Sequence, residues 1–290
     1  MGTRAGLYAV GGPDPSWTGG EVTALARGPD ALWAIADGER ILRGSGGVWE
    51  PVATLSDLRA TCILATASGT HVGTSEAHLF ALSDGALVRD EGFDEVEGRD
   101  AWYTPWGGPP DVRSLALDAA GALCVNVHVG GIPRSADGLT WTPTIDIHAD
   151  VHQVAADRGR ILAATARGLA VSEDAGATWT FHAEGLHAAY CRAVAPLDDA
   201  VLVSASLGPS GGRAALYRFA DDGTLERCER GLPEWFGDNL NTHCVAGRGA
   251  GAAFGTSDGS VYVSSDGGRS WERALERQAP VTAILIGPFD

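Results

Sequence analysis

Apolar and polar residues alternate in short runs along most of this chain, a pattern typical of half-buried β-strands. One form of this pattern recurs: a polar pair leads into an alternating apolar run. The clearest copies are Asp111–Ala116, Asp150–Ala155 and Asn241–Ala246, and the weaker copies are Glu21–Ala26, Arg59–Leu64, Tyr190–Ala195 and Pro280–Leu285. We interpret each copy as the first strand of a repeated unit.

The spacing of these copies predicts the architecture. Numbered by their third residue, they fall at 23, 61, 113, 152, 192, 243 and 282, with spacings of 38, 52, 39, 40, 51 and 39 residues. A base period near 39 residues suits a blade of about four strands. The sequence therefore predicts an all-β, seven-bladed β-propeller in which residues 1–290 form a single domain, with six blades as the alternative count.

A second recurring feature is a phrase rich in turn-forming residues. It occurs in full at Ser172–Trp179 and Ser264–Trp271 and in shortened form at Ser135–Trp141. Each phrase separates two alternating runs and so predicts the turn of a β-hairpin. Ser and Asp side chains can bond nearby amides, Gly allows a positive φ, and Trp offers an apolar face for packing.

These phrases resemble the Asp-box (BNR) repeat of the β-propellers found in sialidases, sortilin-type receptors and photosystem assembly factors. The resemblance implies turns between the third and fourth strands of a blade, on the face opposite the start of the inner strands. It implies no particular chemistry, because the same repeat serves enzymes, receptors and scaffolds.

The two ends of the chain are expected to share the last blade. Only eight residues follow Thr282, whereas Gly6–Val10 and Trp17 resemble an outer hairpin with a degenerate turn phrase at Gly12–Trp17. A blade built from both ends closes the ring and leaves no open sheet edge. The second strand of this shared blade has no visible counterpart in the sequence.

Composition limits which binding partners and which cellular location are expected. The net charge is -16 and every basic residue is Arg, so nucleic acid and anionic membranes are not expected as partners and lysine chemistry is excluded. No apolar segment is long enough to span a membrane, and no secretion signal is recognisable. Five cysteines without a Cys-x-x-Cys pair favour reduced thiols and a cytoplasmic location.

The strand starts predict a functional site at the mouth of the central channel. Starts in four successive blades carry Arg or His, whereas the other three carry Thr. The predicted ligand-binding residues are Arg113, Asp150, Arg192, Asn241, His243 and Trp235, and the predicted catalytic residues are His152 and Tyr190. Such a concentration of polar groups favours a binding pocket, and a solvated rim with inter-blade ion pairs is the alternative.

The two long spacings bring aromatic loops to the same face. One holds Ala101–Pro110 and the other holds Leu207–Gly212 and Gly231–Phe236. Aromatic side chains in such loops can stack on a sugar or an apolar ligand. The alternative is that they pack the loops down onto the blades.

Three histidines suggest a transition-metal site. His128 lies near the end of a second strand that returns to the mouth close to His152, and His243 lies across the channel. Imidazoles from different blades could bind Zn, Fe or Cu. The alternative is hydrogen bonding to a ligand, to Asp150 or to one another.

The resemblance also implies a test for sialidase activity. Arg59, Arg113 and Arg192 could imitate the arginines that clamp a substrate carboxylate, and Tyr190 could imitate the nucleophile. However, the chain has no Arg-Ile-Pro phrase and no Glu at a strand start opposite Tyr190. A sialidase-type glycoside hydrolase is therefore not favoured.

Three functional hypotheses follow. The first is binding, with or without turnover, of a small anionic or polyhydroxylated, glycan-like ligand, in which Arg113 and Arg192 meet negative charge and His152 transfers protons. The second is a protein-interaction scaffold similar to the assembly-factor propellers. The third is an enzyme that uses a transition metal held by His128, His152 and His243.

Overall fold

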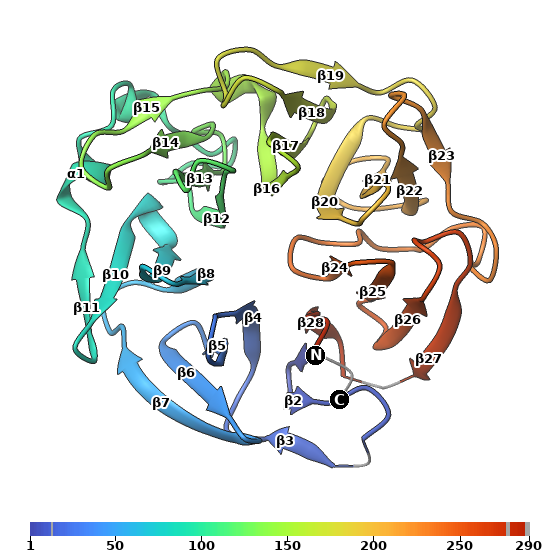
Figure 1. Cartoon of the computed structure of the whole chain (residues 1–290), viewed down its shortest axis with the longest axis horizontal. Coiled ribbons are helices and arrows are strands. Elements are labelled where there is room, and N and C mark those ends of the chain that lie inside the picture. Colours follow the sequence, from blue (N-terminus) through green and yellow to red (C-terminus); the bar gives the residue numbers. More distant parts are fainter. Residues whose placement is uncertain (13, 277–278, 288–290) are drawn as a thin grey trace.

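Seven four-stranded antiparallel sheets surround a central axis in the computed structural model of this chain (Figure 1). The structure describes residues 1–12, 14–276 and 279–287. Each sheet is one blade of a β-propeller, and consecutive blades follow one another round the ring. The predicted seven-bladed propeller is confirmed, and the six-bladed alternative is wrong.

Blades one to six each consist of four consecutive strands. Blade one contains β4 (Val22–Arg27), β5 (Leu32–Ala36), β6 (Arg40–Ser45) and β7 (Val48–Thr54). Blade two contains β8 (Ala60–Thr66), β9 (Gly69–Thr74), β10 (Leu79–Ser83) and β11 (Ala86–Arg89). Blade three contains β12 (Val112–Leu117), β13 (Leu123–Val127), β14 (Pro133–Ser135) and β15 (Thr142–Pro143). Blade four contains β16 (Val151–Asp157), β17 (Arg160–Thr165), β18 (Gly168–Ser172) and β19 (Thr180–His182). Blade five contains β20 (Tyr190–Pro196), β21 (Val201–Ser206), β22 (Ala215–Phe219) and β23 (Leu225–Arg227), and blade six contains β24 (Val245–Arg248), β25 (Gly251–Gly255), β26 (Ser260–Ser264) and β27 (Glu272–Glu276).

Short helices occur only between strands of the described chain. They are the α-helix α1 (Glu91–Asp94) and the 3-10 helices η1 (Ser75–Ala77), η2 (Arg99–Ala101) and η3 (Ile147–Ala149). No helix in the described part of the chain is long and apolar enough to cross a membrane.

Blade seven is built from both ends of the chain, as predicted. Its strands run in the order β28 (Val281–Ala283), β1 (Gly2–Thr3), β2 (Gly6–Tyr8) and β3 (Pro15–Trp17). The second strand, absent from the sequence prediction, is β1, which pairs Gly2 with Ala283. Two residues are too few to show an alternating pattern. Part of the predicted degenerate turn, Pro13, lies outside the described residues.

The hydrophobic core is divided among the blade interfaces. Seven clusters of buried residues are found in the described chain, one between each pair of neighbouring blades. A Cβ on Gly255 would collide with Val281, the first residue of the next blade's inner strand, and a Cβ on Gly73 would collide with Val112 in the same way. Glycine therefore allows adjacent blades to approach closely at these two interfaces.

The three turn phrases form the predicted hairpin turns. In Ser172–Trp179, the Ser172 hydroxyl bonds the Asp174 carboxylate at 2.9 Å and accepts a bond from the amide of Gly176 at 2.8 Å. Ser264 makes the equivalent two bonds in Ser264–Trp271. Each phrase also contacts the segment that enters its blade: the indole Nε1 of Trp179 donates to the carbonyl of Thr144 at 2.7 Å. The phrases therefore join blades as well as strands.

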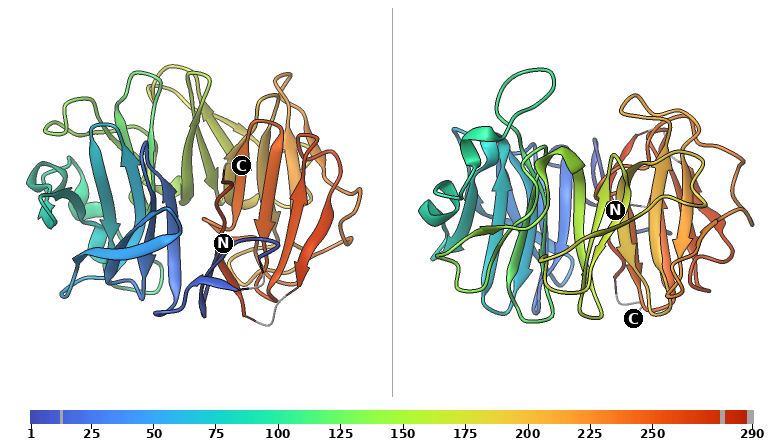
Figure 2. Two further views of the ribbon diagram at one scale, coloured as in Figure 1. Left: turned by 60° about the horizontal axis from the view of Figure 1, so that its bottom comes forward. Right: turned by 90° about the horizontal axis from the view of Figure 1, so that it is seen from above.

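Strand order places the inner-strand starts on one face, which we call the mouth face, and the turn phrases on the other. Loops of both long insertions, which include residues 102–110 and 207–214, rise from the same face of the ring (Figure 2). The insertions and the polar strand starts therefore share the mouth face.

A short segment of blade six crosses the channel mouth. β24 begins at Val245, two residues after the predicted start, because the preceding residues turn inward (Figure 1). The Thr242 hydroxyl reaches the carbonyls of His152 and Arg192 at 3.1 and 2.9 Å, which belong to blades four and five. We call residues 239–244 the plug segment, since it links inner strands across the channel.

Candidate functional site

Three strand starts make equivalent hydrogen bonds to the next blade. The hydroxyl of Thr61 donates to the carbonyl of Val112, that of Thr282 donates to Val22, and the imidazole Nδ1 of His152 donates to Cys191 at 2.6 Å. In each case the accepting carbonyl belongs to the residue just before the strand start of the next blade, which is Arg113, Thr23 or Arg192. His152 therefore occupies a structural position that Thr fills elsewhere, but its ring has a second nitrogen that Thr lacks.

Arg192 lies among neutral partners. Its guanidinium donates to Asn241 Oδ1 at 2.9 and 3.2 Å and to the Tyr190 hydroxyl at 3.2 Å. No carboxylate in the described chain pairs with it. These bonds leave its positive charge without a counter-ion.

Arg113 lies close enough to Arg192 for their charges to repel, and it is also unpaired. Within the described residues its guanidinium makes neither a hydrogen bond nor an ion pair. Burial and the charge of Arg192 lower the pKa of Arg113 to about 10. We call Arg113 and Arg192 the arginine pair. Like charges held together in a partly buried place are unfavourable unless an anion joins them.

Asp150 brings two histidines together. Its Oδ1 lies 3.0 Å from His128 Nε2, and its Oδ2 lies 3.5 Å from His152 Nε2. These three residues are a group whose ligand atoms all lie within 4.8 Å of one another. The predicted metal set of three histidines thus shares His128 and His152 with this group, which contains Asp150 in place of His243.

Burial and neighbouring charges shift the pKa of Asp150 in opposite directions, and they do the same for His152. Partial burial opposes ionisation of Asp150, but the neighbouring imidazoles outweigh it and hold the pKa of the carboxyl well below its usual range. Burial lowers the pKa of His152, although Asp150 acts in the opposite direction. The site therefore favours an ionised Asp150 beside a neutral His152.

His243 lies in the plug segment rather than beside the other two histidines. Its ring bonds the backbone of Arg113 in blade three, and its own carbonyl accepts a bond from the amide of Ile284 at 2.7 Å. Its backbone has a φ of 69°, a left-handed conformation that is uncommon for residues other than Gly. Burial lowers the pKa of His243 to about 4.

We expect His243 to make the protein less stable in mild acid. An unfolded histidine has a pKa near 6.5, so the unfolded state takes up a proton first as the pH falls below that value. The stability contributed by the neutral ring is present above about pH 6.5 and is lost towards pH 4. At pH 5 the loss is roughly 1–2 kcal/mol.

Urea unfolding of the wild type and of His243→Asn at pH 7 and pH 5 tests this expectation. Asn tolerates a positive φ but does not titrate, so the substitution should reduce the acid loss by roughly 1–2 kcal/mol. An identical loss in both proteins would show that other groups cause it.

Two tryptophans of the first aromatic loop lie in different surroundings. Trp102 packs in the core with Phe93, at 6.0 Å between ring centroids. Trp106 is 70% exposed and stacks on the ring of His128 at 5.2 Å. Trp102 therefore packs the loop onto the blade, as in the second alternative, whereas the exposed ring of Trp106 is free of the core.

Trp235 belongs to a separate cluster on the outer part of the mouth face. Its ring lies 4.7 Å from that of His187, and the Arg227 guanidinium lies 3.8 Å from its centroid, a cation–π contact. Arg213 approaches the same ring at 5.8 Å. The structure thus separates Trp235 from the other predicted ligand-binding residues.

Two cavities are relevant to binding. One of about 300 Å³ lies on the mouth face and is lined by Arg4, Thr23, Asn239, Asn241, Thr242, Cys244, Gly255, Ser257, Pro280, Val281 and Thr282. Asn241 links this cavity to Arg192, so the arginine pair lies near its edge.

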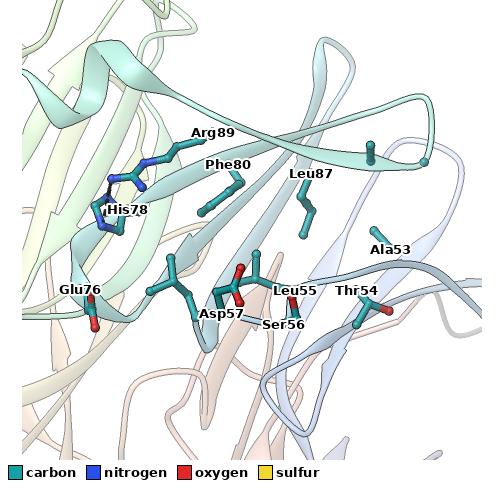
Figure 3. Close-up of a pocket in the computed structure, with 13 residues that line it drawn as sticks. Ala53, Thr54, Leu55, Ser56, Asp57, Glu76, His78, Phe80, Leu87 and Arg89 are labelled. Carbon is teal, nitrogen blue, oxygen red and sulfur yellow. Dashed lines mark hydrogen bonds between the residues drawn. The ribbon is translucent and has the colours of Figure 1, made fainter.

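A larger cavity, of about 800 Å³, lies between blades one and two (Figure 3). Leu55, Phe80 and Leu87 line it, with His78 and Arg89 together at one end. These two side chains are already held by Asp94, at 2.6 and 2.5 Å, so the charged end is neutralised internally. The lining residues are scattered along residues 53–89 without a motif, and sequence analysis did not identify them.

Other residues of the mouth also escaped sequence analysis. Thr242 was not identified because a threonine next to a polar start carries no distinctive signal, and Trp106 was only one member of an aromatic loop. Their roles depend on contacts across the channel and between loop and strand.

Fold and site together define a seven-bladed β-propeller with a polar, plugged channel mouth. No family model matches the chain, and no curated protein matches it. Its relations to known proteins therefore come from solved structures.

Several solved propellers superpose on this chain at low identity. YCF48 from Cyanidioschyzon merolae is 16% identical, with a TM-score of 0.58 over 87% of this chain and 84% of that one. BamB from Moraxella catarrhalis is 16% identical, with a TM-score of 0.57 over 99% and 84%. An ancestral GH74 enzyme is 14% identical, with a TM-score of 0.61 over 84% and 35%. A structure of YCF48 bound to D1 peptide also matches, with a TM-score of 0.57 and 14% identity over 87% and 81%. These similarities show the fold.

Proposed function

We propose that the mouth face binds a ligand through a carboxylate or similar anion held by the arginine pair. The observation that carries this proposal is that Arg113 and Arg192 lie together without a carboxylate partner in the described chain. Guanidinium groups bind carboxylates through paired, charge-assisted hydrogen bonds. Asp150 and Asp111 lie close enough to act on the charge of Arg113, but neither pairs with it directly. An anion would supply the direct partner that both arginines lack.

The positive charge of the arginine pair contrasts with the negative net charge of the whole protein. At -16 the molecule repels anions in general, so an anionic ligand requires a local positive site. The adjoining cavity of about 300 Å³ would accommodate a small molecule or the end of a peptide. Turnover would add roles for Tyr190 and His152, whose rings lie 4.7 Å apart.

Titration calorimetry with citrate, glucuronate and a glutamate-rich peptide tests the proposal. For whichever probe binds, Arg113→Gln should weaken affinity about tenfold or more, because a hydrogen bond to a charged group contributes about 1.5–3 kcal/mol. Arg43→Gln is the matched control, since Arg43 is exposed on β6 in blade one.

The same variant should stabilise the unliganded protein. Arg113→Gln removes a partly buried charge and its repulsion from Arg192, which should raise the stability by about 1 kcal/mol, or roughly 2 °C in Tm. Binding that is equal in wild type and Arg113→Gln, or no binding of any anionic probe, would contradict the proposal.

A protein-interaction scaffold is the second candidate function. Trp235 between two arginines and Leu207, which is 59% exposed, extend the mouth face beyond the arginine pair. Tryptophan and arginine are frequent anchors at protein interfaces. A neighbour in fold, YCF48, binds a D1 peptide. Trp235→Ala should weaken only peptide binding if this larger surface is used.

We also propose a cytoplasmic location. All five cysteines lie in the described chain, are buried and are unpaired. Reduced thiols of this kind support a reducing compartment, and mass spectrometry of alkylated protein from intact cells would test it.

A further inference from the structure

We propose that His128, Asp150 and His152 bind one divalent transition-metal ion, with zinc as the best-fitting metal. The proposed metal site contains neither member of the arginine pair, so it goes beyond the proposed function and is tested separately.

The donor set suits such an ion. Two imidazoles and one carboxylate are a common ligand set for zinc and for non-haem iron. In these sites three protein ligands leave at least one coordination position for water or substrate. Asp150 is half-buried and the two histidines are buried, so the carboxylate gives the site its contact with solvent.

The spacing of the donors is close to what zinc requires. Zinc–nitrogen distances of about 2.0–2.1 Å in a tetrahedral site place ligand atoms roughly 3.3 Å apart. Asp150 oxygens lie 3.0 Å from His128 Nε2 and 3.5 Å from His152 Nε2. All three donors lie within 4.8 Å of one another. A small side-chain adjustment would therefore surround an ion.

The orientation of His152 points its second ring nitrogen, Nε2, at a carboxylate oxygen of Asp150. Its Nδ1 lies 2.6 Å from the carbonyl of Cys191, which can only accept, so Nδ1 carries a proton. In the neutral ring Nε2 is then an acceptor, and it faces Asp150 Oδ2, which is also an acceptor. His152 is fully buried, and its Nε2 has no hydrogen-bond partner among the described residues. A cation between the two atoms resolves this conflict.

The surroundings resemble the outer shell of a metal site. Metal-binding histidines usually donate their second ring nitrogen to a carbonyl or carboxylate, which fixes the ring, as Cys191 does for His152. Trp106 stacks on His128 and restricts that ring from the other side. Arg113 acts against a cation, because its charge lies close enough to affect Asp150. The three ligands must therefore outweigh this repulsion.

Metal titration of the full chain, purified without a histidine tag and freed of metal with a chelator, tests the site. Calorimetry with zinc chloride should give about one ion per chain for the wild type. His128→Gln and Asp150→Asn should each lower the affinity about tenfold or more. His182→Gln is the matched control, because this histidine lies on the outer strand β19 and should leave the affinity unchanged.

A second readout uses the wild type alone and so does not depend on the folding of variants. Cobalt bound by two imidazoles and a carboxylate in a four- or five-coordinate site absorbs strongly in the visible range, and zinc should displace that signal. Weak absorption typical of hydrated cobalt would overturn the proposal. So would a wild type that binds well below one ion per chain, or equal zinc affinity in the wild type, His128→Gln and Asp150→Asn.

Discussion

Gly231→Ala is expected to destabilise the protein by about 3–5 kcal/mol. Gly231 has a φ of 82°, where an L-residue is strained, and an added Cβ would lie well inside the van der Waals radius of the Trp271 carbonyl oxygen. That contact partner is backbone and is held by the bond from the Trp271 amide to the Arg230 carbonyl at 2.9 Å. Neither Gly231 nor the Trp271 carbonyl can move without breaking this hydrogen bond, which links blade six to the segment that follows blade five. Urea unfolding measures the loss.

Gly223→Ala separates the two causes. Gly223 has a φ of 86°, but the nearest atom to an added Cβ is 3.9 Å away, on His182. Only backbone strain applies there, so the expected cost is about 1–2 kcal/mol. Equal losses in the two variants would show that the contact with Trp271 is unimportant.

Trp271→Ala should cost about 3–5 kcal/mol, the usual range for a buried large aromatic. The side chain is 6% exposed, packs against Phe254 at 5.0 Å and donates from Nε1 to the Gly268 carbonyl at 3.0 Å. Its removal would leave a cavity between blades five and six, where its cluster lies. The loss is measured by denaturant unfolding.

Trp106→Ala is the matched control for this loss of an indole. Trp106 is 70% exposed, so its removal should change the free energy of unfolding by less than about 0.5 kcal/mol. A small effect of Trp271→Ala would mean that the turn phrases contribute little to the joining of blades.

The fold was largely predictable because each blade repeats the same pattern. Alternation predicts strands, the period predicts blades, and Ser172–Trp179 predicts a turn whose bonds the structure contains. β1 was missed because a strand of two residues has no period. The late start of β24 was missed because the polar residues before it match the repeat in sequence but cross the channel in space.

The site was predictable only in part. Repeat register brings Tyr190, Arg192 and Asn241 to one face, and Arg192 donates hydrogen bonds to both of the others. Register does not determine side-chain direction, however. Asp150 turns towards the two histidines, whereas His243 is carried away by the plug segment. Contacts across a ring depend on where loops fold, which a repeat pattern does not encode.

The shared blade has a mechanical consequence. Residues 2–3 and 281–283 are neighbours in one sheet although they are far apart in the chain. A force that pulls the two ends apart would therefore load the short β1–β28 pairing first, before any of the other six sheets. Once that pairing opened, the ring would become an open arc, and blades would detach one at a time from its ends. The resistance of the molecule to stretching is thus set by a pairing between strands of two and three residues.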